Sequence, residues 1–364
     1  MRRIKWILFV AVLILFASCA GKKKVNEQNG DQAKETKVEN HIVQDFVFGD
    51  DRPFAQCHAS TLVKLNPDGF LVAWFAGTEE KNPDVGIWVS SGKPGHWTPP
   101  VQLAKVRQDA HWNPVLFRAP NGEIHLFFKV GKTIDKWETW VMVSADEGKT
   151  WSKAHELVSG DRGGRGPVKN KPIVLSDGTW LAGASDEPGK YWDVFVDRSE
   201  DSGHTWKATE YLEIDHANLK GKGVIQPTLW ESEPGKVHML VRSSEEYIYR
   251  SDSEDFGITW NPLYKTELAN PNSGIDLVRM TDGTLVLAYN PDSKNWGARA
   301  PLTLALSFDN GKTWPEQLDI ETGGKDDEFS YPSIVSWADS FAVVYTWQRQ
   351  RVRMALGTPE DIGK

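Results

Sequence analysis

Side chains that could bind an anion or transfer a proton lie at the starts of β-rich segments spread over most of the chain. Two are arginines, Arg242 and Arg299, and a guanidinium group meets a carboxylate through two parallel charge-assisted hydrogen bonds. Tyr331, Asp84 and Glu80 are residue types that serve in acid–base chemistry. Together they suit a reaction on an acidic substrate, provided that the fold brings them to one place.

Further polar side chains stand at comparable places, at the openings of apolar segments: His58, His111, Asn113, Lys169, Lys171, Asn272 and Asn290. Any one of them alone is better explained as a structural residue, in an ion pair or in the core. Their recurrence at equivalent places favours a shared site instead.

A repeat of about 54 residues organises the chain and must position these side chains. Octapeptides of the form S-x-D-x-G-x-T-W begin at Ser144, Ser199, Ser253 and Ser307, and a degenerate copy begins at Ser90. In each copy the Asp can accept hydrogen bonds from turn amides, the Gly allows a positive φ and the Trp can pack between sheets. Near-identical copies cannot all line one asymmetric site, so we interpret the octapeptide as structural.

A second series of turns runs in phase with the octapeptides, and an apolar, β-rich run follows each turn. The turns are Asp68-Gly69, Asn121-Gly122, Asp177-Gly178, Pro234-Gly235, Asp282-Gly283 and Asp339-Ser340. Such turns between apolar runs indicate β-hairpins. Six hairpins predict six units of about four strands, which must pack around an axis to bury both sheet faces. We therefore predict an all-β, six-bladed β-propeller, in which residues 41–48 supply the outer strand of the last blade.

The first forty residues differ from the rest. Residues 1–18 combine a basic start, a short apolar run and a small-residue ending, which is typical of a secretory signal. Phe16-Ala17-Ser18-Cys19 resembles a bacterial lipobox, in which Cys19 carries a lipid; an ordinary cleaved signal and a single anchor helix are the alternatives. Residues 19–40 are almost wholly polar and predict a tether to a domain at 41–364. Ala20 after the cysteine favours the outer membrane.

Composition excludes several other classes of protein. The 364 residues include 17 Trp and 40% hydrophobic residues, as expected for a globular domain. The formal net charge is −8, and because Arg2, Arg3 and Lys5 lie in the signal, the remainder carries −11; nucleic acid is therefore a poor partner. The nine histidines and two cysteines show no metal-ligand spacing, and no cofactor is expected. A bridging Ca²⁺ at Asp326-Asp327-Glu328 stays open, although acidic loops are usually just solvated.

The octapeptide resembles the Asp-box of the sialidase superfamily, and with the hairpins the resemblance extends over residues 41–364. Asp-boxes also occur in propellers without activity, so the chemistry has to be compared residue by residue. Members of the superfamily hold a substrate carboxylate with three arginines, protonate the leaving oxygen with an Asp and attack with a Tyr that a Glu assists. A neutral Tyr suits this role, because the substrate carboxylate repels an anionic nucleophile.

The resemblance assigns Arg242 and Arg299 to the second and third arginines, Tyr331 to the nucleophile and Asp84 to the acid. The other residues expected at the same end of the inner strands, as catalytic or substrate-binding groups, are Glu80, Asn113, Lys171 and Asn290.

Two positions depart from the superfamily pattern. His58 stands where the first arginine is expected, and it would bind a carboxylate more weakly and with a pH dependence. Gln226 stands where the Glu is expected, and an amide cannot take a proton from Tyr331. These departures place both the Tyr mechanism and plain sialic acid specificity in question.

The resemblance implies an exo-acting glycoside hydrolase, working as a monomer, that removes a terminal acidic sugar, sialic acid or a related one, from glycans. If Tyr331 is not the nucleophile, Asp84 and Glu80 would support an inverting reaction through water, for which the two carboxylates lie roughly 6.5–9.5 Å apart. A uronate lyase is an alternative, because the arginines would neutralise the carboxylate while a His or Tyr takes the C5 proton. A glycan-binding surface protein without chemistry is the third.

Overall fold

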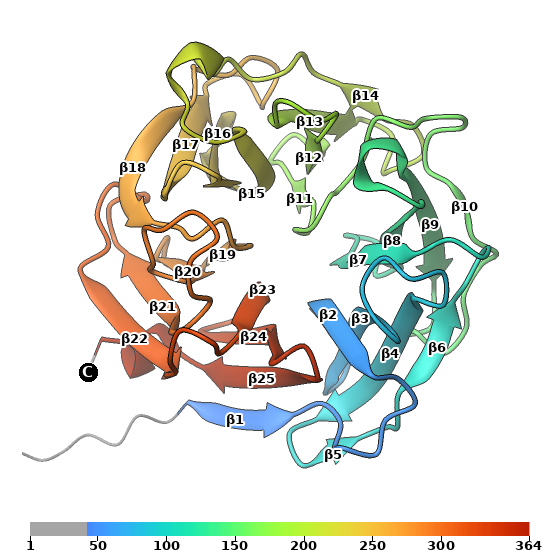
Figure 1. Cartoon of the computed structure of the whole chain (residues 1–364). Coiled ribbons are helices and arrows are strands. Elements are labelled where there is room, and N and C mark those ends of the chain that lie inside the picture. The colour runs from blue at the N-terminus through green and yellow to red at the C-terminus, as the bar shows by residue number, and fades with distance from the viewer. Residues whose placement is uncertain (1–41, 364) are drawn as a thin grey trace, which may run out of the picture. The chain divides into compact units, whose positions relative to one another are not determined.

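The computed structural model describes residues 42–363, and these residues form six antiparallel sheets arranged in a ring (Figure 1). Each sheet is one blade, and its first strand in the chain lies nearest the centre of the ring, except in the last blade, which an N-terminal strand completes. The predicted six-bladed β-propeller is confirmed.

The blades follow one another along the chain. Blade 1 holds β2 (Gln56–Lys64), β3 (Phe70–Gly77), β4 (Gly86–Lys93), β5 (His96–Trp97) and β6 (Val101–Ala104). Blade 2 holds β7 (His111–Arg118), β8 (Ile124–Val130), β9 (Glu138–Ser144) and β10 (His155–Glu156), and blade 3 holds β11 (Ile173–Val174), β12 (Trp180–Asp186), β13 (Asp193–Ser199) and β14 (Lys207–Ala208). Blade 4 holds β15 (Val224–Glu233), β16 (Lys236–Ser243), β17 (Tyr247–Ser253) and β18 (Tyr264–Ala269), and blade 5 holds β19 (Asp276–Arg279), β20 (Leu285–Tyr289), β21 (Leu302–Ser307) and β22 (Glu316–Glu321). Blade 6 holds β23 (Phe329–Trp337), β24 (Ser340–Trp347), β25 (Arg351–Gly357) and β1 (Val43–Phe46). Three short 3₁₀ helices, Ile134–Lys136, His216–Asn218 and Pro359–Asp361, complete the elements of the described residues.

The ring is closed by sequence from both ends of the domain. β1 pairs antiparallel with β25, with Val43 opposite Leu356 and Phe46 opposite Arg353. Just after β1, Phe48 packs on Trp74 of blade 1, with ring centroids 4.8 Å apart. The predicted closure of the last blade by N-terminal sequence is therefore confirmed, and one short segment joins blades 6 and 1.

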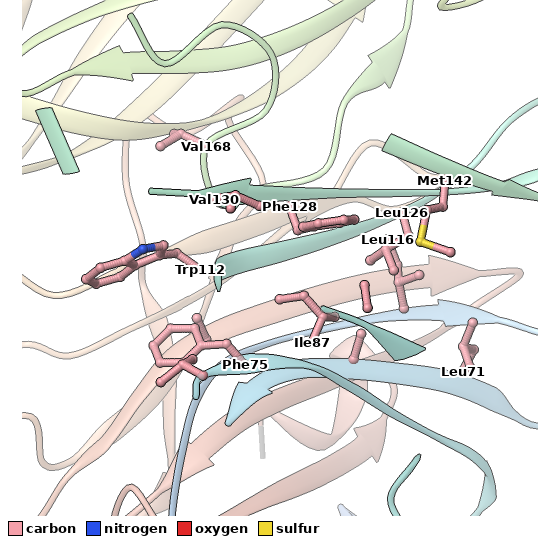
Figure 2. Packing of buried hydrophobic residues seen from close by; sticks show 14 of the residues in the cluster. Leu71, Phe75, Ile87, Trp112, Leu116, Leu126, Phe128, Val130, Met142 and Val168 are labelled. Atoms are coloured by element: carbon pink, nitrogen blue, oxygen red, sulfur yellow. The ribbon is translucent and has the colours of Figure 1, made fainter. Parts of the chain in front are cut away.

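Apolar side chains fill the seams between neighbouring blades. Alternate residues of a strand face opposite sides of its sheet, so each blade supplies side chains to two seams. On β24, Phe341, Val343 and Tyr345 face blade 5, while Ala342 and Val344 face blade 1. In the seam between blades 1 and 2, Figure 2 shows side chains from the two sheets packed against one another, among them Leu71, Phe75, Ile87, Leu116, Phe128 and Met142.

The repeated octapeptides form the turns between the third and fourth strands of their blades, at the outside of the ring. In the first clean copy, both oxygens of Asp146 accept hydrogen bonds from Thr150, at 2.8 Å from the amide and 2.6 Å from the hydroxyl. These hydrogen bonds, the hydroxyl's first, lower the pKa of Asp146 to about 2. Trp151 donates to the carbonyl of Gly148 at 3.0 Å. The octapeptides are structural, as predicted.

The predicted hairpin turns join the first two strands of each blade. At Gly69 the backbone has φ +88°, and an added Cβ would lie 2.8 Å from the carbonyl oxygen of Gly92. Only glycine meets both conditions without strain.

Three expectations from the sequence concern segments that lie outside the described residues: the signal at 1–18, the lipidated Cys19 and the tether at 19–40. Within residues 42–363 there is no helix with the length and apolar character needed to cross a membrane. The same residues contain no group of three or more His, Cys, Asp or Glu placed to hold a metal ion.

The contribution of ring closure to the stability of the folded protein can be tested at Phe48. We expect Phe48→Ala to lower the free energy of unfolding by about 3–5 kcal/mol, because it leaves a cavity against Trp74 at the join between the first and last blades. Urea denaturation followed by Trp fluorescence measures the change. Phe308 is 58% exposed, and Phe308→Ala is the control, with an expected effect within about 0.5 kcal/mol. Equal effects of the two changes would show that the N-terminal segment does not hold the ring closed.

Candidate active site

Four inner strands carry a β-bulge near the starting end of the strand, where the ring surrounds its axis. The register shifts between His58 and Thr61 in β2, between Trp112 and Val115 in β7, between Ile225 and Thr228 in β15, and between Ser330 and Ser333 in β23. The residues with positive φ inside these shifts are Ala59 (54°), Asn113 (36°), Gln226 (60°) and Tyr331 (52°). A bulge turns a side chain away from the regular alternation. In three of the four strands the turned side chain lines the same central cavity.

This cavity has a volume of about 270 Å³. Six of the residues singled out in the sequence line it: Glu80, Asn113, Gln226, Arg242, Arg299 and Tyr331. They come from blades 1, 2, 4, 5 and 6, so the ring brings together residues far apart in the chain.

Tyr331 lines the cavity with two guanidinium groups near its ring, those of Arg242 and Arg299. Arg242 Nη1 donates to Tyr331 Oη at 2.5 Å, and the same nitrogen donates to Gln226 Oε1 at 3.1 Å. Gln226 Nε2 donates more weakly to Tyr331 Oη, at 3.4 Å. On its other side Arg242 Nε donates to Asn272 Oδ1 at 2.7 Å, which fixes the orientation of the guanidinium plane. Arg299 lies near the same Tyr331 ring, with Cζ 5.6 Å from the ring centroid.

A third guanidinium group, which the sequence did not reveal, also lines the cavity. It belongs to Arg349, in the turn after β24, whose Nε donates to both oxygens of Glu328 at 3.1 and 3.0 Å. Arg299 Nη1 donates to the same Glu328 at 2.9 Å, and Arg349 also pairs with Glu80. Burial alone would lower the pKa of Arg349, but the charges of Glu328 and Glu80 hold it above its usual value.

The position of Arg349 at the site could have been predicted from the direction of the strands in a blade. Strands in a blade are antiparallel, so the end of the second strand lies beside the start of the first. Arg349 follows β24, just as Glu80 follows β3. The same reasoning identifies Glu187, which follows β12 and lines the cavity together with Trp192. On the rim, Trp296 is 63% exposed and its ring centroid lies 6.0 Å from Cζ of Arg242.

Four of the residues given a catalytic or substrate-binding role from the sequence do not line the cavity. Asp84 is exposed in the loop after β3, where its two oxygens accept from the Thr78 amide at 2.7 Å and the Thr78 hydroxyl at 2.9 Å. Lys171 donates to Asp276 at 2.9 and 3.1 Å and faces a separate hollow. Asn290 is buried and donates to backbone carbonyls of two neighbouring segments. Their contacts hold loops and strands together.

His58 is the fourth of these residues, and it lies behind Tyr331 with 2% of its surface exposed. Its ring centroid is 4.2 Å from that of Tyr331, and Nδ1 lies 2.9 Å from the hydroxyl oxygen of Thr346. Burial lowers the pKa of His58 well below its usual value, and the nearby charges of Arg349 and Arg299 lower it further. A neutral imidazole supports the Tyr331 ring and carries no charge for a substrate.

A six-bladed propeller with three guanidinium groups around one central cavity defines the class of the protein: it is a sialidase-like β-propeller. The chain belongs to the BNR repeat-like domain family, which matches residues 68–344. A sialidase from Paraclostridium sordellii is 25% identical over 270 residues, which cover 60% of this chain and 62% of the relative. The chain therefore matches less than two thirds of that relative's length.

Solved structures of low sequence identity share the fold. The Hadza microbial sialidase Hz136 matches with a TM-score of 0.70 at 16% identity, over 84% of this chain and 66% of the other. A mutant of NanB sialidase from Streptococcus pneumoniae matches with a TM-score of 0.69 at 13% identity, over 87% and 71% of the two chains.

The environment of His58 leads to a prediction about pH. We expect its imidazole to stay neutral between pH 5 and 8, because burial and the arginines oppose protonation in the folded state. The unfolded chain binds a proton here below about pH 6.5, so this residue makes the folded state less stable as the pH falls through that value. Two-dimensional ¹H–¹⁵N spectra of the imidazole nitrogens give the measurement. A His58 signal that titrates near 6.5 in the folded protein would contradict the buried, neutral role.

Proposed function

We propose that this protein is an exo-acting glycoside hydrolase that removes a terminal acidic sugar, sialic acid or a close relative, from glycans. One observation supports this proposal above the others: three arginines line one cavity together with Tyr331, whose hydroxyl accepts a hydrogen bond from Arg242. The cavity volume of about 270 Å³ suits one sugar ring rather than a long chain.

The three arginines would bind the substrate carboxylate. Arg349 supplies the guanidinium group that His58 does not, from the other side of the join between blades 6 and 1. Glu328 and Glu80 balance two of the three charges, so the cavity keeps an excess of positive charge that favours a carboxylate. Hydrogen bonds to charged groups contribute about 1.5–3 kcal/mol each, and bidentate pairing fixes the orientation of the sugar.

Tyr331 would present its oxygen to the anomeric carbon. The transition state of glycoside hydrolysis has positive charge at this carbon, and a neutral phenol is not repelled by the substrate carboxylate. As the phenol proton passes to water and the Tyr331 oxygen bonds to the anomeric carbon, the guanidinium group of Arg242 at 2.5 Å stabilises the negative charge on this oxygen. Gln226 orients both groups but cannot accept the phenol proton, so we expect slow turnover through a Tyr nucleophile.

The N-terminal features belong to the same proposal. A lipid on Cys19 would anchor the protein to the outer membrane, and the polar tether at 19–40 would let the propeller reach glycans as a monomer.

The proposal is tested with 4-methylumbelliferyl N-acetylneuraminide and sialyllactose, with products analysed by mass. We expect release of N-acetylneuraminic acid, with one water added across the bond. Arg349→Gln should lower kcat/KM by about tenfold or more, since a charge-assisted hydrogen bond to the carboxylate is lost. Tyr331→Phe should lower kcat by about 10²-fold or more, since the oxygen at the anomeric carbon is lost.

Matched controls for these variants are Arg279→Gln and Tyr264→Phe, whose side chains are exposed away from the cavity. Neither control should alter turnover. A product lighter by one water would show elimination instead, and binding without any product would show a glycan-binding protein; either result contradicts the proposed hydrolase.

A change at Gln226 should raise activity, whereas the changes above lower it. We expect Gln226→Glu to raise kcat by about tenfold or more, because a carboxylate beside Tyr331 can take its proton, and general-base catalysis contributes about 10²–10⁴-fold. Steady-state kinetics on the aryl substrate give the measurement, and the exposed Gln108→Glu is the control. A stably folded Gln226→Glu protein with unchanged or lower kcat would show that Tyr331 does not act as a nucleophile.

A further inference from the structure

A second hollow, of about 410 Å³, adjoins the central cavity between blades 2 and 3. The residues that line both spaces are Lys81, Trp112, Ile134, Glu187 and Trp192. Shared lining residues mark the boundary between two spaces. A ligand that fills both must therefore pass these side chains.

The two spaces share Trp112 and Trp192 but differ in charged groups. Guanidinium groups suited to a carboxylate line the central cavity alone, whereas Lys132 and Lys222 line the second hollow alone. Lys222 Nζ lies 5.5 Å from the ring centroid of Trp192. Aromatic faces and single polar groups are what neutral sugar rings require, because the ring C–H groups pack on the aromatic surface. A glycan bound by its acidic end in the cavity would thus continue into the second hollow.

Glu187 is the one carboxylic acid among the described residues that line both spaces. It lies half-buried just after β12, in the connection to β13. No hydrogen bond or ion pair ties its carboxyl group to another residue within 42–363, whereas Glu80 pairs with Arg349 and Glu328 pairs with Arg299 and Arg349. Its carboxyl group is therefore available to a ligand at the boundary.

We propose that Glu187 is the catalytic acid that protonates the leaving-group oxygen, at the boundary where the acidic sugar in the cavity is bonded to the glycan in the second hollow. This assignment rests on the proposed hydrolase function. It replaces the role expected for Asp84, which is exposed and held by Thr78.

The proton balance of the reaction is simple. In the first step the Glu187 carboxyl proton moves to the glycosidic oxygen as its bond to the anomeric carbon breaks, and the bonding electron pair stays with the oxygen. The Tyr331 oxygen bonds to the anomeric carbon in its place, and the phenol proton passes to water. In the second step a water oxygen bonds to the anomeric carbon as the bond to the Tyr331 oxygen breaks; the Glu187 carboxylate takes a proton from this water, and the Tyr331 oxygen, which keeps the bonding pair, takes a proton back from water. Across both steps the carboxyl group is restored and one water is consumed.

The surrounding charges are consistent with an acid that keeps its proton. Burial raises the pKa of Glu187, and Asp186 raises it further, while Arg242 and Lys222 lower it. Of the other charged residues, Glu80, Arg299 and Arg349 line the central cavity, Lys132 and Asp135 line the second hollow, and Lys81 lines both. A raised pKa suits a carboxyl group that must donate a proton near neutral pH.

The test compares two leaving groups in the purified protein. A sugar hydroxyl leaves poorly without a proton, whereas 4-methylumbelliferone leaves readily as its anion. We expect Glu187→Gln to lower kcat/KM on sialyllactose by about 10²–10⁴-fold and on 4-methylumbelliferyl N-acetylneuraminide by less than about tenfold. The fall of kcat/KM at alkaline pH, seen with sialyllactose in the unmutated protein, should be absent in the variant. Activity on the aryl substrate also shows that the variant is folded.

The control for Glu187→Gln is Glu200→Gln in the outer turn of the same blade, which should leave both substrates unaffected. Glu80→Gln should lower turnover of both substrates by similar factors, because it changes the setting of Arg349 rather than proton transfer. Equal losses of kcat/KM on both substrates for Glu187→Gln would overturn the assignment of Glu187 as the acid, and so would a leaving-group dependence that appears with Glu80→Gln instead. Neither result would overturn the proposed hydrolase function. Failure of the unmutated protein to hydrolyse either substrate would overturn the proposed function and this assignment with it.

Discussion

The carboxylate of Glu328 is the electrostatic constraint on which the centre of the ring depends. Guanidinium groups crowded around one cavity repel one another, and Glu328 accepts hydrogen bonds from Arg299 of blade 5 and Arg349 of blade 6. Burial would raise the pKa of this carboxyl group, but the arginine charges hold it below its usual value. Glu328 therefore stays ionised, and the pairing stabilises the folded state at neutral pH and weakens as acid protonates the carboxylate. Without it, the same arginines would turn away from one another toward water.

Much of the fold was readable from the sequence, because a structural repeat leaves a local signature at every turn. The octapeptides and hairpin turns indicate the number of blades and about four strands in each, since each turn depends on residues close together in the chain. Gln226 and Tyr331 on the inner strands of blades 4 and 6, and Arg242 at the end of the second strand of blade 4, were also found, because the resemblance to the superfamily assigns roles to these positions.

The rest of the site could not be read in this way, because it depends on loops. Arg349 and Glu187 lie just beyond the second strands of blades 6 and 3, where no repeated motif marks them. Asp84 was expected at the site from the resemblance to the superfamily, yet its carboxylate accepts hydrogen bonds from Thr78 and it does not line the cavity. His58 does lie near the axis, but its side chain is buried behind Tyr331, next to the bulge at Ala59, and does not reach the cavity. Sequence spacing predicts which end of a strand a residue occupies and leaves its depth open.

Closure of the last blade by β1 has a mechanical consequence. β1 is the outermost strand of its sheet, three strands removed from β23, which carries Tyr331. A pull transmitted through the preceding residues acts first on the pairing of Val43 to Phe46 with β25. The inner strands would bear such a load only after this outer strand had separated, so the ring isolates its central cavity from tension at the point where the chain enters the domain.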